Sequence, residues 1–194
     1  MTIHTATERM LLRRFTPDDL GLLVELDSDP LVMHHINGGF PTPPEVVRDK
    51  VLPRILGYYE RYERLGFWAA VDPARAEFLG WFHFRPPTTA PPGATGTAEL
   101  GYRLRRAAWG RGYAAEGARA LIRTGFTDPG LHRVTAITRA THSASRRVME
   151  KSGLSFRRVA PDSGGDIVEY ALDRTAWARR VDGHGARDTP ATGP

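Results

Sequence analysis

The segment that most constrains the fold is a turn with two glycines, Trp109-Gly-Arg-Gly-Tyr-Ala-Ala-Glu-Gly, past the middle of the 194-residue chain. It follows a short run readable as a strand, Ala98–Leu104. After the turn, apolar side chains recur at spacings of three and four, which predicts a helix from 112 to about 127: Ala115, Ala118, Ile122 and Phe126. The glycines therefore lie at a helix N-terminus, where unpaired N–H groups and the helix dipole favour a bound diphosphate.

From the residues alone, three other interpretations of this turn compete with a diphosphate site. The glycines can simply mark a helix start. A nucleoside-triphosphate loop lacks its Lys-Ser/Thr pair here. Gly110-Arg-Gly112-Tyr-Ala-Ala115 does satisfy a dinucleotide fingerprint, but the next predicted strand, His132–Thr138, ends in Arg139 instead of an acid. The pattern therefore favours a diphosphate cradle, to which Arg111 and Arg106 would add positive charge.

The rest of the chain reads as short strands interleaved with helices. Strands are predicted at 8–15, 66–73, 77–85, 98–104, 132–138, 155–160 and 166–172, and helices at 17–27, 31–36, 43–65, 112–127 and 143–152. This order predicts an α/β fold whose mixed sheet carries helices on both faces. We expect one domain over residues 1–178, a polar, flexible tail over 179–194, and a long connection from Pro86 to Thr97 that shapes the mouth of a site.

Composition limits the class of protein. The chain is 41% hydrophobic and 25% charged, as in a globular domain. It has no cysteine, which excludes disulfides, thiolate metal sites and an acyl-cysteine intermediate. Residues 1–15 lack an apolar signal core, and no run of about 18 apolar residues occurs. We therefore expect a cytoplasmic protein without a membrane partner.

The net charge of +5 is unevenly distributed. Residues 101–158 hold 13 of the 27 Lys and Arg residues but only three acids: Glu116, Asp128 and Glu150. Such a segment suits an anionic partner, so a basic module that binds RNA or the ribosome without catalysis stays an alternative. We expect no specific nucleic-acid site.

Three blocks of the sequence resemble the GCN5-related N-acetyltransferases. They are Glu99-Leu-Gly-Tyr-Arg-Leu, the glycine turn, and Ala144-Ser-Arg-Arg-Val-Met-Glu-Lys-Ser-Gly-Leu. The openings Thr7-Glu-Arg-Met-Leu-Leu-Arg-Arg-Phe-Thr-Pro-Asp-Asp and Ser28-Asp-Pro-Leu-Val-Met are similar to the branch that acetylates ribosomal-protein N-termini (RimJ/RimL-like). The resemblance spans about residues 7–172. It implies a single domain with a twisted, centrally splayed sheet, acetyl-CoA as co-substrate, no metal, and a homodimer.

The resemblance also implies a set of cofactor-binding residues. Backbone amides of the turn would grip the CoA diphosphate, and the strand before it would pair with the pantetheine arm. The predicted set is Tyr102, Leu104, Arg106, Trp109, Gly110, Arg111, Gly112, Tyr113, Ala114, His142 and Lys151. Two positions depart from the family pattern: Ala107 replaces a Gln or Arg that often begins the turn, and His142 replaces an Asn that bonds the cofactor arm.

Two residues are predicted to carry the chemistry. Glu99 would accept a proton from the amine, directly or through one water, because an ammonium has no lone pair to attack a thioester. Ser145 would protonate or solvate the leaving thiolate. Each has a structural alternative: an exposed strand glutamate, and a first-turn serine that satisfies backbone groups. A backbone N–H of the strand that holds Glu99 would stabilise the oxyanion.

The histidines and aromatic residues give weaker signals. His34, His35 and His83 have no second pair at metal-ligand spacing, so no metal site is predicted. His83, with Trp68, Trp81 and Phe82, is expected in the core or at the acceptor mouth.

The function predicted from the sequence is acetyl transfer from acetyl-CoA to a primary amine by direct attack in a ternary complex. The acceptor would be a protein N-terminus, with a ribosomal protein possible, or a small-molecule amine. A CoA-binding regulator without catalysis is the second alternative.

Overall fold

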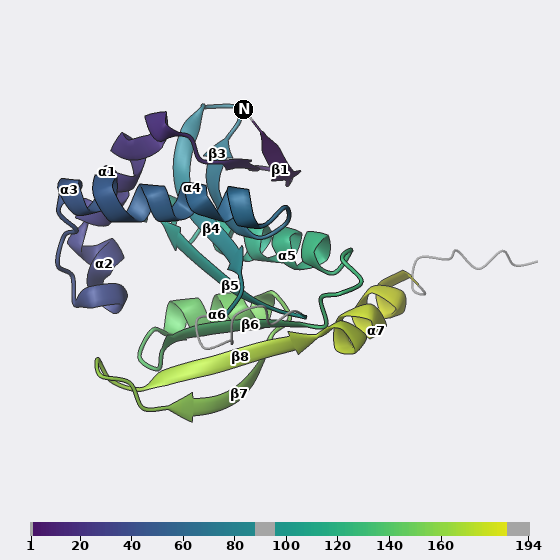
Figure 1. Ribbon diagram of the computed structural model, residues 1–194. Coiled ribbons are helices and arrows are strands. Elements are labelled where there is room, and N and C mark those ends of the chain that lie inside the picture. The colour runs from purple at the N-terminus through teal and green to yellow at the C-terminus, as the bar shows by residue number, and fades with distance from the viewer. Residues whose placement is uncertain (1, 88–95, 186–194) are drawn as a thin grey trace, which may run out of the picture.

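One sheet of eight strands organises the chain, in the order β1-β2-β3-β4-β5-β6-β8-β7 (Figure 1). The computed structural model describes residues 2–87 and 96–185. The strands are β1 Ile3–Ala6, β2 Leu11–Arg14, β3 Gly66–Asp72, β4 Glu77–Arg85, β5 Thr97–Leu104, β6 Arg133–Arg139, β7 Ser155–Ala160 and β8 Ile167–Asp173. Neighbouring strands run antiparallel except β5 and β6, which run parallel.

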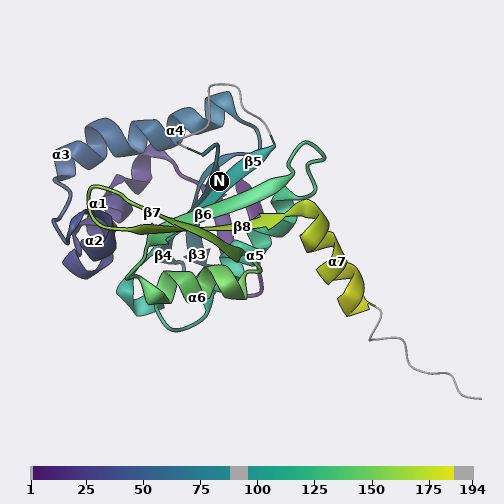
Figure 2. The ribbon, with the colours of Figure 1, turned by 90° about the horizontal axis from the view of Figure 1, so that it is seen from below.

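Helical segments connect these strands. They are η1 Pro17–Asp19, α1 Leu20–Ser28, α2 Pro30–Asn37, α3 Pro44–Val46, η2 Val47–Val51, α4 Leu52–Arg61, η3 Arg106–Ala108, α5 Tyr113–Gly125, α6 Ser143–Lys151 and α7 Arg174–Gly185. Figure 2, seen from below, shows α4 on one side of the sheet and α6 on the other. The expected mixed sheet with helices on both faces is confirmed.

Each face of the sheet has its own core. On one face, α5 buries Ala118, Leu121 and Ile122 against Phe82 and Leu100 of the strands. On the other face, α1 and α4 bury Leu23 and Ile55 against Phe67 and Phe78. Strand residues alternate between the faces, and β3 and β4 bury apolar side chains on both sides, whereas one face of β5 carries Glu99 and Arg103.

The two middle strands separate part-way along their length. β5 and β6 pair only from Thr97↔Arg133 to Glu99↔Thr135. Beyond that point β5 stays with β4 as far as Leu104, and β6 stays with β8 as far as Arg139. A slot therefore opens between β5 and β6, and the predicted central splay is confirmed.

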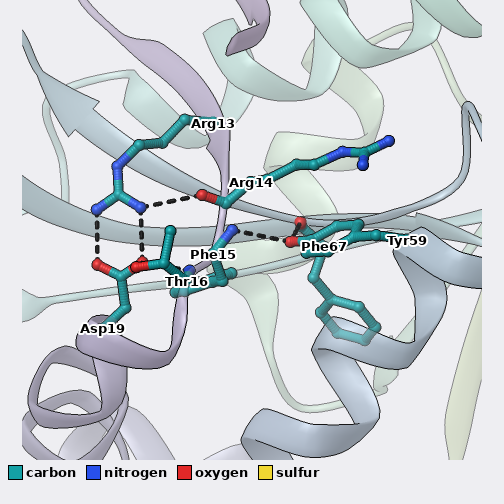
Figure 3. A network of polar contacts seen from close by, with 7 residues as sticks. All are labelled: Arg13, Arg14, Phe15, Thr16, Asp19, Tyr59 and Phe67. Carbon is teal, nitrogen blue, oxygen red and sulfur yellow. Dashed lines mark hydrogen bonds and ion pairs between the residues drawn. The ribbon is translucent and has the colours of Figure 1, made fainter. Parts of the chain in front are cut away.

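A polar network fastens the N-terminal helices to the sheet (Figure 3). Arg13 of β2 forms a bidentate pair with Asp19 at 2.6 and 2.7 Å, and Asp19 also accepts the Thr16 N–H at 2.8 Å. Tyr59 of α4 accepts the Phe15 N–H at 3.0 Å and donates to the Phe67 carbonyl of β3. Burial raises the pKa of Tyr59 to about 12, so its hydroxyl remains a donor. These bonds fix α1 and α4 over β2 and β3.

The boundaries differ from the expectations in three places. The predicted strand 8–15 is shorter, and the sequence analysis missed β1, whose residues lack an apolar run. The predicted helix 43–65 ends at Arg61 and contains a π-helical turn, η2, that ends two residues before Pro53. Proline has no N–H to continue the regular ladder, which accounts for an irregular turn there.

The sequence analysis also missed α7. Trp177 packs against Phe126 with ring centroids 5.2 Å apart, and Arg174 donates to the carbonyls of Phe126, Asp128 and Leu131. The helix runs through the first part of the predicted tail. Residues 186–194 of that tail, and most of the Pro86–Thr97 connection, lie outside the described residues. Within the part of the chain that the structure describes, no helix is long and apolar enough to cross a bilayer.

The backbone of β4 at Gly80 packs tightly against β5, and a substitution there tests this contact. Its φ is +132°, and an added Cβ would lie 2.2 Å from the Arg103 carbonyl oxygen and 2.6 Å from the Leu104 Cα. We expect Gly80→Ala to lower the free energy of unfolding by about 2 kcal/mol or more, measured by urea denaturation. Gly21→Ala in α1, where a Cβ meets nothing within 4 Å, should raise it by about 0.5–1 kcal/mol. Equal midpoints for the two variants would contradict this.

Candidate active site

A hydroxyl pair joins β5 to α6 beside the slot. The Tyr102 hydroxyl donates to the Ser145 carbonyl at 3.1 Å and shares a hydrogen bond with Ser145 Oγ at 3.0 Å. Burial raises the pKa of Tyr102 to about 12, so it keeps its proton at neutral pH. Ser145 itself is buried. The structure thus brings together two predicted site residues that are 43 positions apart in the chain.

The glycine turn lies at the N-terminus of α5, as predicted. Gly110 and Gly112 have φ values of 70° and 84°, which side-chain-bearing residues rarely adopt. Gly112 is the N-cap, and no side chain caps this helix within the described residues. The first-turn amides, including those of Tyr113 and Ala114, therefore remain available to an anion. Trp109 fastens the turn to β5, because its Nε1 donates to the Leu104 carbonyl at 2.8 Å.

Arg9, which the sequence analysis missed, braces the same turn from between β1 and β2. Its Nη1 donates to the Arg111 carbonyl at 2.9 Å, and its Nε to Glu116 at 2.7 Å. Its guanidinium lies 4.5 Å from the centre of the Tyr113 ring. Burial raises the pKa of Glu116, but hydrogen bonds from Thr7 and Arg9 outweigh it, so this pKa is lowered. Arg9 and Glu116 are 107 positions apart, and no local pattern signals the contact.

Two other predicted cofactor residues have different surroundings. Arg106 lies 2.5 Å from Asp29, so an acid already offsets part of its charge. Lys151 is the last residue of α6, whereas His142 is the N-cap of that helix. Lys151 follows Ser145 by six residues, a helical rise of about 9 Å, so it lies more than one turn away from Ser145. The structure does not gather Lys151 with the hydroxyl pair.

Glu99 is the residue at which β5 and β6 part. Its side chain is buried, with 6% of the residue exposed, so the alternative of an exposed strand glutamate is wrong. Arg85 Nη2 lies 2.5 Å from Glu99 Oε1, and His83 Nε2 lies 3.4 Å from the same oxygen. The predicted base is thus held in a buried cluster of charge.

His142 joins α6 to α2. Its ring stacks on His35 with centroids 3.9 Å apart, and His34 lies edge-on to His35 at 4.7 Å. Burial, with the neighbouring His35 and His34, lowers the pKa of His142 to about 4. No group of three or more metal-ligating side chains forms a metal site among the residues described. A neutral imidazole at this position can still donate one hydrogen bond.

Comparison with known proteins identifies the family. Residues 9–155 match the model of the acetyltransferase (GNAT) domain. This chain belongs to the GNAT family. Acetyl transfer is therefore its activity at the level of the family.

Individual relatives agree with this GNAT assignment. A protein of Aspergillus fumigatus named FsC-acetyl coenzyme A-N(2)-transacetylase is 32% identical over 92% of this chain and 78% of its own length. A GNAT-family acetyltransferase from Bacillus anthracis superposes with a TM-score of 0.71 at 25% identity, covering 90% of this chain and 99% of that one.

The RimL acetyltransferase of ribosomal protein L7/L12, solved with coenzyme A, superposes with a TM-score of 0.72 over 88% of this chain and 97% of its own. Its identity is only 18%, so this likeness concerns the fold. The predicted GNAT superfamily is confirmed, and the ribosomal-protein branch is not.

Most of the basic charge in this GNAT domain is used internally. Seven of the 13 basic residues in 101–158 form ion pairs: Arg103, Arg105, Arg106, Arg133, Arg139, Arg157 and Arg158. The first three bind Asp27, Glu25 and Asp29, which belong to α1 and its C-terminal end. These three pairs attach the N-terminal helices to the end of β5. Arginines that are paired within the domain are less available to bind RNA.

The stacked His142 makes folding stability depend on pH. An unfolded histidine titrates near pH 6.5, and His142 in the folded GNAT domain near pH 4. The unfolded chain therefore binds more protons between these values, so stability is complete above pH 6.5 and falls as the pH drops towards 4. We expect His142→Asn to lose less stability over this interval than the parent, by urea midpoints at pH 7.0, 5.5 and 4.5. Parallel losses in the two proteins would contradict this.

Proposed function

We propose that this GNAT domain transfers an acetyl group from acetyl-CoA to a primary amine by direct attack in a ternary complex. The observation that supports it most is the slot between β5 and β6, which opens at Glu99 and leads towards the uncapped N-terminus of α5. An elongated cofactor with an anionic diphosphate matches both features. The relative from A. fumigatus is named an N(2)-transacetylase, which supports nitrogen as the acceptor atom.

The residues around the slot fit this cofactor. Backbone amides from Gly110 to Ala114 would hold the diphosphate, because the helix N-terminus offers unpaired N–H groups and positive potential. Past Glu99, β5 has no strand partner on its β6 side within the described residues, so its edge suits the amide-bearing pantetheine arm. His142, at the start of α6, would donate to the same arm.

The Tyr102–Ser145 pair suits the leaving group. When the amine nitrogen attacks the thioester carbon, a C–N bond forms and the C–S bond breaks. The thiolate that leaves needs a proton. Ser145 Oγ, hydrogen-bonded to the protonated Tyr102 hydroxyl, is our candidate donor. The amine must also lose a proton, for which the buried groups around Glu99 are the candidates.

The alternatives receive less support. The seven internal ion pairs leave less free positive charge for RNA, and the family match favours catalysis over a purely regulatory role. The likeness to RimL extends only to the fold, so a ribosomal protein as acceptor stays a prediction. A homodimer and a cytoplasmic location also stay predictions.

Calorimetry with acetyl-CoA tests the cofactor site directly. We expect a Kd between about 1 μM and 1 mM for the parent chain. Gly110→Ala should weaken binding about tenfold, because an L-residue disfavours a φ of 70° by roughly 1–2 kcal/mol and the turn relaxes away from the binding shape. Gly21→Ala is the control and should bind like the parent. Absence of binding to the parent would refute the proposal.

Ser145→Ala tests the leaving-group role. We expect turnover to fall roughly 10²-fold while acetyl-CoA affinity is kept, because only the proton donor is removed. Ser143→Ala, two residues earlier and exposed, is the matched control and should keep full turnover. Release of free thiol from acetyl-CoA with a panel of amines provides the measurement. Equal turnover in Ser145→Ala and the control would remove Ser145 from the mechanism.

A further inference from the structure

Within the site proposed above, we infer that the imidazole of His83 takes the proton from the acceptor amine, and that Glu99 is a positioning residue beside it. This inference rests on the proposed acetyl transfer and adds a residue to it. It also changes the role of Glu99 from the group that accepts the proton to a side chain that stabilises protonated His83.

The His83 ring lies against the backbone of β5. His83 of β4 is the register partner of Gly101 of β5. A Cβ added at Gly101 would lie 2.4 Å from His83 Cε1 and 2.5 Å from Nε2. The imidazole therefore lies directly against the Gly101 backbone, two residues past the point where β5 leaves β6. That stretch of β5 forms one wall of the slot.

The ring nitrogens of His83 are buried and incompletely satisfied. Nδ1 has no hydrogen-bond partner among the described residues, and Nε2 has the 3.4 Å contact with Glu99 Oε1. The ring stacks on Trp81 with centroids 5.7 Å apart and meets the edge of Phe67 at 5.2 Å. Leaving a buried polar atom unsatisfied costs free energy. An amine that approaches Nδ1 would supply the missing partner.

Charged side chains of β4 and β5 face the His83 ring. Burial lowers the pKa of His83, and Arg85 and Arg103 lower it further, against the opposing effect of Glu99. The imidazole is therefore neutral at pH 7, with a lone pair on one nitrogen. Glu99 Oε1 lies 3.4 Å from Nε2, and Glu99 is the acid closest to the ring among the contacts described. Once the ring accepts a proton, this carboxylate stabilises the imidazolium.

Glu99 is less suited to accept the proton itself. Arg85 lies 2.5 Å from its Oε1, so this oxygen is already engaged and is less available to an approaching amine. The arrangement resembles a histidine base with an acid as its orienter.

The proposed step is balanced. The acceptor ammonium gives one proton to His83, and the freed lone pair attacks the thioester carbon. The C–N bond forms, the C–S bond breaks, and the electron pair of that bond leaves on sulfur. The second amine proton replaces the one that the thiolate takes from the Tyr102–Ser145 pair. His83 then returns its proton to solvent.

The test compares His83→Gln with His4→Gln across pH 5 to 9, using the amine that releases thiol fastest. His4 is a matched control, because its ring also stacks on a tryptophan, Trp68, and its pKa is also lowered by burial. We expect His83→Gln to lose about 10²–10⁴-fold in kcat at pH 7 with acetyl-CoA affinity unchanged. The rise of kcat/KM with pH below 6.5 should disappear, and added imidazole should restore part of the rate.

A second variant tests the geometry. Gly101→Ala would push the imidazole aside, so it should lower kcat in the parent but cost little more in the His83→Gln background. Glu99→Gln should keep measurable turnover and move the rising limb of kcat/KM to lower pH, because the imidazolium loses its stabilising charge.

The outcomes separate the two proposals. Failure of the parent to bind acetyl-CoA, or to use any amine, overturns the acetyl-transfer function and this inference with it. An active parent whose His83→Gln variant keeps its rate and pH profile overturns the role of His83 alone. Loss of all turnover in Glu99→Gln, with mild effects in His83→Gln, would return the proton-accepting role to Glu99.

Discussion

The short pairing of β5 with β6 is the constraint on which the rest of the site depends. The two strands run parallel for three residue pairs and then each continues beside its outer neighbour, β4 or β8. The inner edges beyond Glu99 therefore present backbone groups that need partners. The Tyr102–Ser145 pair, His83 and the glycine turn all lie along this opening. A fully paired sheet would hold the same residues in a closed core.

The two faces of β5 carry different residues of the proposed site. Tyr102 points towards α6, where it meets Ser145, whereas Glu99 and Gly101 face the side of His83 and Arg85. Strand geometry dictates this, since successive side chains point to opposite faces. In the proposed mechanism, β5 thus places Tyr102 beside the candidate proton donor Ser145 on one face and packs Gly101 against the candidate proton acceptor His83 on the other.

The sequence predicted those parts of the molecule that local patterns encode. The spacing of Ala115, Ala118, Ile122 and Phe126 located α5, and the glycines located its N-terminus. Contacts between distant segments had no such signal: Arg9 with Glu116, Tyr102 with Ser145, and His35 with His142. His83 was expected at the core or the acceptor mouth, but the surroundings of its ring depend on three strands packing together. The helix α7 was likewise not predicted, because its composition is polar and its packing depends on the contact of Trp177 with the distant Phe126.

The attachment of α1 to the end of β5 differs in strength along its length. Arg103 and Asp27 are both largely buried, whereas Arg105–Glu25 and Arg106–Asp29 are partly open to solvent. Mobile ions screen exposed charges within about 10 Å at 0.1 M salt but reach buried pairs far less. Of the three pairs between α1 and the end of β5, one is therefore insensitive to ionic strength and two respond to it. In a salt-rich medium the two outer pairs would weaken first, whereas Arg103–Asp27 and the apolar core beneath α1 would keep the helix in place.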